Sequence, residues 1–96
     1  MFARKTHRRL VAAGAPELPD KYFYHPTVKY IGDRPFVSME IRRRRGLRSV
    51  VVSHYVIDPD KLLDDDGESM ATKVSRLCRN AALQCHDFDT EWSSNV

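Results

Sequence analysis

The stretch "VSMEIRRRRGLRSVVVSHYV", residues 37–56, decides the fold. Apolar and polar residues alternate on both sides of a run of arginines, which is the period-two pattern of a half-buried strand. A two-residue loop at Arg45 and Gly46 would bring the apolar residues of the two halves together. A shift of one residue would mix the apolar and polar sets, so the pattern predicts a hairpin in this register with the arginines at its tip. The predicted pairs are Ile41 with Val50, Met39 with Val52, and Val37 with His54.

Three further elements are indicated around this hairpin. Residues 3–13 predict a short helix with a basic exposed face, because a glycine and a proline follow directly. The aromatic and β-branched content of residues 22–31 predicts a strand, and Pro26, which lacks a backbone N–H, makes it either an edge strand or a bulged strand. Apolar residues at steps of three and four predict a helix over residues 69–88.

These elements predict one small α+β domain over residues 1–96, with residues 89–96 as a flexible tail whose Trp92 can fold back. A sheet of about three antiparallel strands would carry the 69–88 helix on its apolar face, and the 3–13 helix would pack at an edge. We expect the inner face of the hairpin to consist of Val37, Met39, Ile41, Val50, Val52 and Val56.

Charge is divided unevenly along the chain, although the net formal charge is only +3. Residues 1–50 hold twelve Lys and Arg against four Asp and Glu, a net +8, whereas residues 51–96 hold four against nine, a net −5. Such asymmetry is typical of a nucleic-acid surface, of a surface for an acidic protein, or of two halves that neutralise each other.

The acidic part of the chain is the connection of residues 58–68, called the acidic loop below. Its aspartates suit the positive end of the following helix, which Ser69 or Asp66 would cap. Calcium binding is not indicated: with Gly67 as the sixth loop position, Leu62 and Lys73 would occupy the first and twelfth, where carboxylates are required.

No motif for catalysis, a metal or a cofactor is found. The histidines lie on separate elements and no CxxC or HxxxH spacing occurs. His54 is interpreted as a packed core residue on the apolar strand face. Cys78 and Cys85 would lie about 10.5 Å apart on one helix, too far for a disulfide, and are interpreted as reduced core thiols. We therefore expect no enzyme activity, no cofactor and no metal.

The hairpin tip is the best candidate for a binding surface. Crowded like charges cost stability unless an anion neutralises them, and the planar fork of arginine suits phosphate or carboxylate. The anion could belong to a nucleic acid, to a host protein with an acidic surface, or to the acidic loop of the chain itself. The aromatic residues of the 22–31 strand suit base stacking or, more simply, core packing. The expected partner-binding residues are Arg42, Arg43, Arg44, Arg45 and Arg48, with Lys5, Arg8 and Arg9 of the first helix.

Two stretches, "HRRLVAAGAPELPDKYFYH" and "VSMEIRRRRGLRSVVV", resemble small uncharacterised proteins of phages that infect actinobacteria. The resemblance covers about residues 7–57 and implies a viral origin and the cytoplasm of a host cell, without implying an activity. The element order is also similar to that of the double-stranded RNA-binding domain. Where that family has lysines before its last helix, this chain has "DDDGESMA".

Together these features predict a non-enzymatic binding protein that engages a host macromolecule, either protein or nucleic acid, through its basic half. The alternative is a structural or oligomeric virion-associated protein whose arginines pair with a neighbouring subunit, and the oligomeric state stays open. No stretch approaches the roughly 20 apolar residues of a membrane span, so we expect no membrane partner and a cytoplasmic location.

Overall fold

The computed structural model describes residues 2–85 and residue 87. The order of elements is helix, three strands and two helices, which confirms the predicted α+β class. The predicted tail with its tryptophan lies outside the described residues. The elements are α1 (Phe2–Ala12), β1 (Tyr22–Ile31), β2 (Arg34–Arg45), β3 (Arg48–Ile57), α2 (Pro59–Leu63) and α3 (Met70–Leu83).

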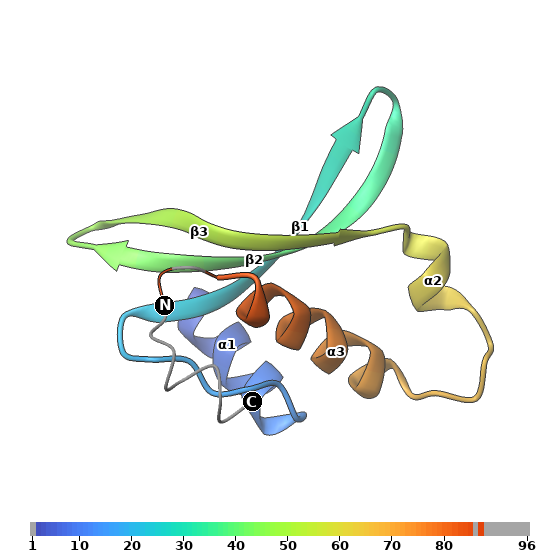
Figure 1. The fold of residues 1–96 in the computed structure, drawn as a ribbon, viewed down its shortest axis with the longest axis horizontal. Helices are drawn as coiled ribbons and strands as arrows, with labels where there is room; N and C mark the ends of the chain where they lie inside the picture. Colours follow the sequence, from blue (N-terminus) through green and yellow to red (C-terminus); the bar gives the residue numbers. More distant parts are fainter. Residues whose placement is uncertain (1, 86, 88–96) are drawn as a thin grey trace.

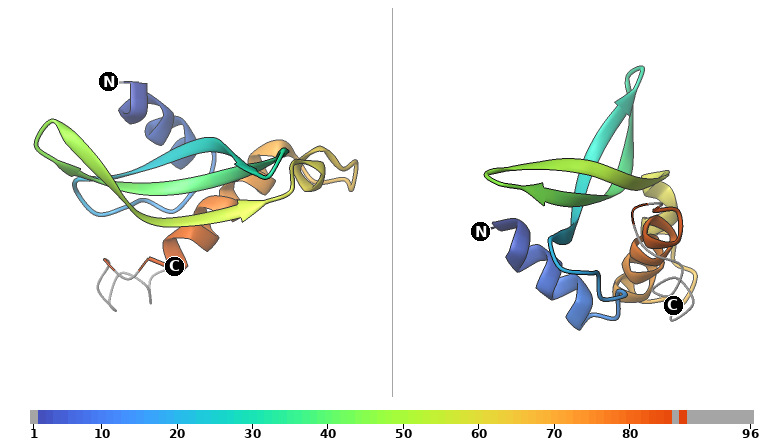
Figure 2. Two further views of the ribbon diagram at one scale, coloured as in Figure 1. Left: turned by 90° about the horizontal axis from the view of Figure 1, so that it is seen from above. Right: turned by 60° about the vertical axis from the view of Figure 1, so that its left-hand side comes forward.

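The three strands form one antiparallel sheet in the order β1-β2-β3, and α1 and α3 lie on the same side of it (Figures 1 and 2). Helix α3 packs against β2 and β3, as predicted, and α1 packs mainly against β1. The molecule therefore has two layers, and the opposite face of the sheet carries no helix among the described residues (Figure 2).

The core lies between the sheet and α3. Tyr24, Met39 and Ile41 point into it from β1 and β2 and are fully or almost fully buried. The Tyr24 hydroxyl donates a hydrogen bond to the carbonyl of Pro16 at 2.5 Å, which satisfies its polar end. Cys78 and Cys85 are buried and are not joined in a disulfide, as predicted, and burial raises the pKa of Cys78 to about 12. Such a thiol stays protonated and serves as a small apolar side chain.

The hairpin forms, but its predicted register is wrong. The two-residue turn consists of Gly46 and Leu47, so that Arg45 lies opposite Arg48. Gly46 has φ = 63°, and a hairpin turn that needs a positive φ at its first position favours glycine there. A β-bulge follows: Ile41 pairs with Ser53 and Arg42 with Val51, which leaves Val52 as the extra residue.

From Ser53 to the end of β3, the bulge reverses which side of the strand faces the core. Ser53, predicted on the solvent face, is buried, and its hydroxyl donates to the carbonyl of Ala81 in α3 at 2.6 Å. Tyr55 packs against the core in place of Val56. The interpretation of His54 as a core residue is therefore wrong, because its side chain is exposed. Of the six predicted inner residues, Val37, Met39, Ile41 and Val52 belong to the core or pack on it, whereas Val50 and Val56 do not.

The ends of α3 and the acidic loop also differ in part from the expectation. Ser69 caps α3 as predicted, because its hydroxyl accepts the Thr72 N–H at 3.1 Å. Helix α3 ends at Leu83 rather than at residue 88. Within the acidic loop, Asp58 caps the unpredicted short helix α2, which begins with Pro59.

One end of the β1–β2 hairpin extends away from the body. Strand β3 pairs with β2 only as far as Val37, so residues 29–36 form a two-stranded ribbon (Figure 1). Tyr30 and Ile31 on this ribbon are largely exposed. We call residues 29–36 the β1–β2 ribbon.

Candidate nucleic-acid interface

The tip of the β2–β3 hairpin is held clear of the body. Strand β1 pairs with β2 only up to Tyr22 and Arg43, and one further hydrogen bond joins the Arg44 N–H to the Lys21 carbonyl at 2.8 Å. Lys21 has φ = 77°, which is uncommon for a residue other than glycine and turns the chain into β1 at this point. Residues 44–49, called the arginine tip below, therefore extend past the edge of the three-stranded sheet.

The hairpin arginines fall into two groups: held side chains, which bind an acidic residue of the protein, and free side chains, which do not. Arg42 is held, because its guanidinium bonds Glu40 Oε1 at 2.9 Å and Ser49 Oγ at 2.8 Å. Arg43 is paired with Asp87 at 2.9 Å. Within the described residues, by contrast, Arg44, Arg45 and Arg48 make no ion pair and no side-chain hydrogen bond; all three are exposed.

One of the free arginines, Arg44, shares a groove with α1. Arg4 and Arg8 of α1 line a groove of about 610 Å³ together with Lys21 and Arg44; we call it the basic groove. Two carboxylates, Glu17 and Asp20, also line it, so its four cations exceed its anions by two. Lys5 and Arg9 lie with Arg4 and Arg8 along a second hollow on α1. Of the predicted cations of the first helix, the structure thus brings Arg8 into one groove with a hairpin arginine, whereas Lys5 and Arg9 line a hollow that contains no hairpin residue.

Three residues of this surface were absent from the sequence-based prediction. Arg4 lies one helical turn before Arg8, a spacing that could have identified it. Lys21 gave no such signal, because its place depends on the left-handed turn. His7 lies on the groove wall, where its Nδ1 accepts the Tyr24 backbone N–H at 3.3 Å. Burial lowers the pKa of His7, and the charge of Glu17 opposes this only in part, so the ring is neutral at pH 7.

The acidic loop lies at the other end of the molecule. It follows the end of β3 that is remote from the tip (Figure 1), and the ten residues of β3 extend about 30 Å at roughly 3.3 Å each. Charges at that separation are screened, since the Debye length is about 8 Å at physiological ionic strength. The loop therefore does not neutralise the arginine tip.

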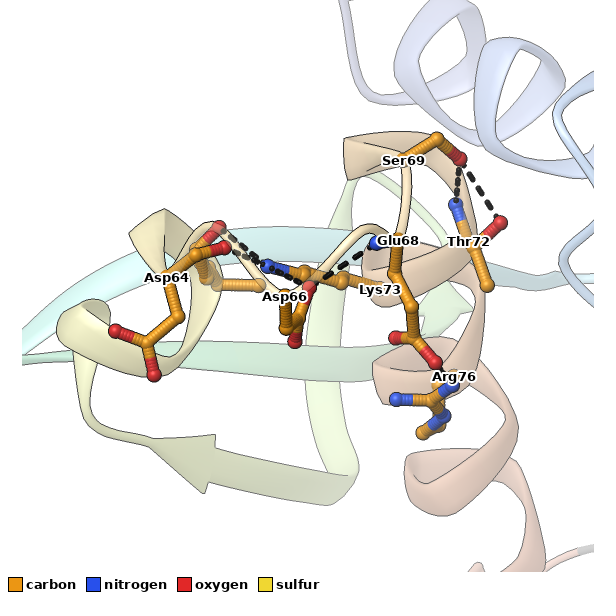
Figure 3. A network of polar contacts seen from close by, with 8 residues as sticks. Asp64, Asp66, Glu68, Ser69, Thr72, Lys73 and Arg76 are labelled. Carbon is orange, nitrogen blue, oxygen red and sulfur yellow. Dashed lines mark hydrogen bonds and ion pairs between the residues drawn. The ribbon is translucent and has the colours of Figure 1, made fainter.

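The acidic loop instead has its own cations (Figure 3). The Lys73 ammonium, which is almost fully buried, bonds the Asp64 carbonyl at 2.5 Å and Asp66 Oδ1 at 3.0 Å. Arg76 pairs with Glu68 at 2.7 Å. These contacts lower the pKa values of the Asp66 and Glu68 carboxyls. The loop is thus a local structural unit on α3.

The aromatic residues of β1 are divided between core and surface. Tyr24 is buried in the core, and Phe23 is buried beside the arginine tip, where it lines both the basic groove and a hollow at the turn. Tyr30 is exposed, but it lies on the β1–β2 ribbon, away from the arginine tip (Figure 1). Core packing therefore accounts for the most buried of these rings.

The part of the chain that the structure describes shows no site for a metal ion and no membrane-spanning helix. No group of three or more His, Cys, Asp or Glu side chains in residues 2–85 and 87 is arranged to hold a metal ion. None of the helices described there combines the length and apolar character needed to cross a membrane. No family model, no curated protein and no solved structure matches this chain.

Proposed function

We propose that the chain is a small non-enzymatic binding protein whose basic surface binds the phosphate backbone of a nucleic acid. One observation carries the proposal: Arg44 of the hairpin and Arg4 and Arg8 of α1 line a single groove, and the acidic loop lies about 30 Å away. Repulsion among such cations disfavours the free protein, and a polyanion along the groove removes it.

The length of the cationic surface favours a nucleic acid over an acidic protein. The 11 residues of α1 extend about 16 Å, and its cations line two hollows, one of which reaches Arg44 of the arginine tip. A ligand must present negative charge along that whole length. A phosphate backbone does so regardless of sequence, whereas a protein surface needs a matched row of carboxylates. The exposed arginines also suit bidentate contact with phosphate oxygens.

Salt dependence of binding tests the proposal. Fluorescence anisotropy with a labelled duplex should give a straight line of log affinity against log salt, with a slope of about −0.9 for each phosphate neutralised. The double variant Arg45→Ser/Arg48→Ser should reduce that slope by about 2. The control Lys61→Ser/Arg79→Ser removes the same charge from exposed positions outside both the arginine tip and the basic groove and should leave the slope near wild type. Equal slopes for the two double variants would contradict the proposal.

Capture from a host lysate, with and without nuclease, separates the remaining classes of partner. We expect material captured by the wild type to be lost after nuclease treatment and after the Arg45→Ser/Arg48→Ser change. If a host protein is still captured after nuclease treatment, the partner is that protein and not a nucleic acid. A defined oligomer at micromolar concentration that requires the arginines would instead support a structural, virion-associated role.

A further inference from the structure

Leu47 occupies an unusual position for an apolar residue. It is the second residue of the two-residue turn and is fully exposed. After a glycine in such a turn, Asn, Asp or Ser is the usual residue, because the side chain points into water. The three free arginines of the tip surround it in sequence, and Arg45 and Arg48 are directly opposite each other in the ladder. An apolar side chain thus stands at the apex of a cationic ribbon.

The arginine tip has the dimensions of a groove-entering element. The last row of the three-stranded sheet contains Tyr22, Arg43 and Val50, and three residues lead from Arg43 to Gly46. At roughly 3.4 Å per residue the tip extends about 10 Å beyond that row. The minor groove of B-DNA is about 7.5 Å deep, so the apex can reach the base pairs while arginines remain beside the phosphates.

We infer that Leu47 inserts between adjacent base pairs of duplex DNA from the minor groove and bends the duplex, while Arg44, Arg45 and Arg48 bind the flanking phosphates. Apolar wedges of this kind unstack a base step, and the bent duplex then contacts more of the protein. The cations of α1 are placed to receive it, because Arg4 and Arg8 share a groove with Arg44. This inference rests on the proposed binding of nucleic acid, and it specifies duplex DNA as the ligand and its minor groove as the point of contact.

B-form DNA fits this geometry better than duplex RNA. The minor groove of A-form RNA is wide and shallow, and its major groove is too narrow for side chains to read. The minor groove of B-form DNA is about 6 Å wide, and the bend that a wedge produces widens it for a ribbon whose two backbones lie about 5 Å apart. A wedge also favours steps that are already poorly stacked, so a mismatch or a nick should increase affinity.

The test combines bending and binding on matched duplexes of about 30 base pairs, a length over which bending is measurable. Energy transfer between dyes at the two ends should rise when wild-type protein binds. Affinity for a duplex with one central mismatch should be about tenfold higher than for the perfect duplex. Leu47→Ser should abolish both effects and keep the wild-type salt slope, because no cation is removed. Leu47→Phe should retain both.

The outcomes distinguish this inference from the proposed function. If wild type and Leu47→Ser bind with the same salt slope and the same energy transfer, the wedge is wrong and phosphate binding stands. Stronger binding to duplex RNA than to DNA of the same sequence would also overturn the wedge. If the wild type binds no duplex at all, both proposals fail. The thermal unfolding midpoint of Leu47→Ser should equal that of the wild type. An equal midpoint shows that a loss of bending reflects the side chain and not the fold.

Discussion

His7 joins α1 to the sheet through Tyr24. The imidazole Nδ1 accepts the Tyr24 backbone N–H at 3.3 Å, and the two rings stack with centroids 5.3 Å apart. Only an unprotonated nitrogen can accept this bond, so protonation removes it and places a cation between Arg4 and Arg8 in sequence. The attachment of α1 therefore depends on a neutral His7.

Acidification should weaken the fold through this histidine. Its pKa is lowered in the folded state, so the unfolded chain binds the proton more readily, and stability falls as pH drops below about 6.5. The measurement is the free energy of unfolding in urea at about pH 7.5 and about pH 5.5. His7→Gln should show a smaller loss than wild type between these two values. The same loss of unfolding free energy in both proteins would show that protonation of His7 does not destabilise the fold.

Ser53 and His54 test the β-bulge. Ser53→Lys would place a charge against α3, where the Ser53 hydroxyl now bonds Ala81, and should abolish cooperative unfolding. His54→Lys adds the same side chain at an exposed neighbouring position and should change stability by less than about 0.5 kcal/mol. Thermal unfolding followed by circular dichroism compares them. The reverse ranking would restore the register without a bulge.

Lys73 should stabilise the acidic loop more than the exposed ion pair does. Lys73→Met leaves the Asp64 carbonyl without its donor and should cost about 1–3 kcal/mol, because the ammonium is almost fully buried. Arg76→Gln removes only an exposed ion pair and should cost clearly less stability than Lys73→Met. Urea midpoints of the two variants provide the comparison. Equal costs would mean that water replaces the Lys73 contacts.

Arg42 and Arg45 should respond oppositely to substitution although they belong to one run. Arg42→Ser deprives the buried Glu40 of its closest cation, leaving Lys29 at 3.7 Å, and should cost about 1–3 kcal/mol. Arg45→Ser removes repulsion with Arg48 and should leave stability unchanged or raise it by up to about 0.5 kcal/mol. Unfolding at low salt makes the contrast largest. A destabilised Arg45→Ser would indicate an internal role for the tip.

With the exception of α2, the elements were predictable because each has a clear period or a clear stop signal. The register of the hairpin was not, because three consecutive valines at 50–52 satisfy either face of a strand and conceal the bulge. The turn was placed one residue too early, since the positive φ needed at its first position falls on Gly46. Two-residue loops that differ by one step look alike in a run of arginines.

The candidate site was predictable in its charge and not in its geometry. Identical arginines at 42–45 differ in role because Glu40 holds Arg42 and Asp87 holds Arg43, and Asp87 is 44 residues away in sequence. The joining of α1 to the hairpin depends on the left-handed turn at Lys21 and on the His7 contact, neither of which has a periodic signal. Tertiary contacts between residues distant in sequence therefore decide both the role of each arginine and the position of α1.

The β1–β2 ribbon exposes backbone on both of its sides together with Tyr30 and Ile31, a combination that usually invites aggregation. Each of its strands contains a proline near this region: Pro26 in β1 and Pro35 in β2, just beyond the last β2–β3 pair. A proline has no N–H to offer to an incoming strand, so neither side can add another chain in a continuous ladder. The two prolines therefore interrupt strand addition along both edges of this hairpin while its apolar side chains stay exposed.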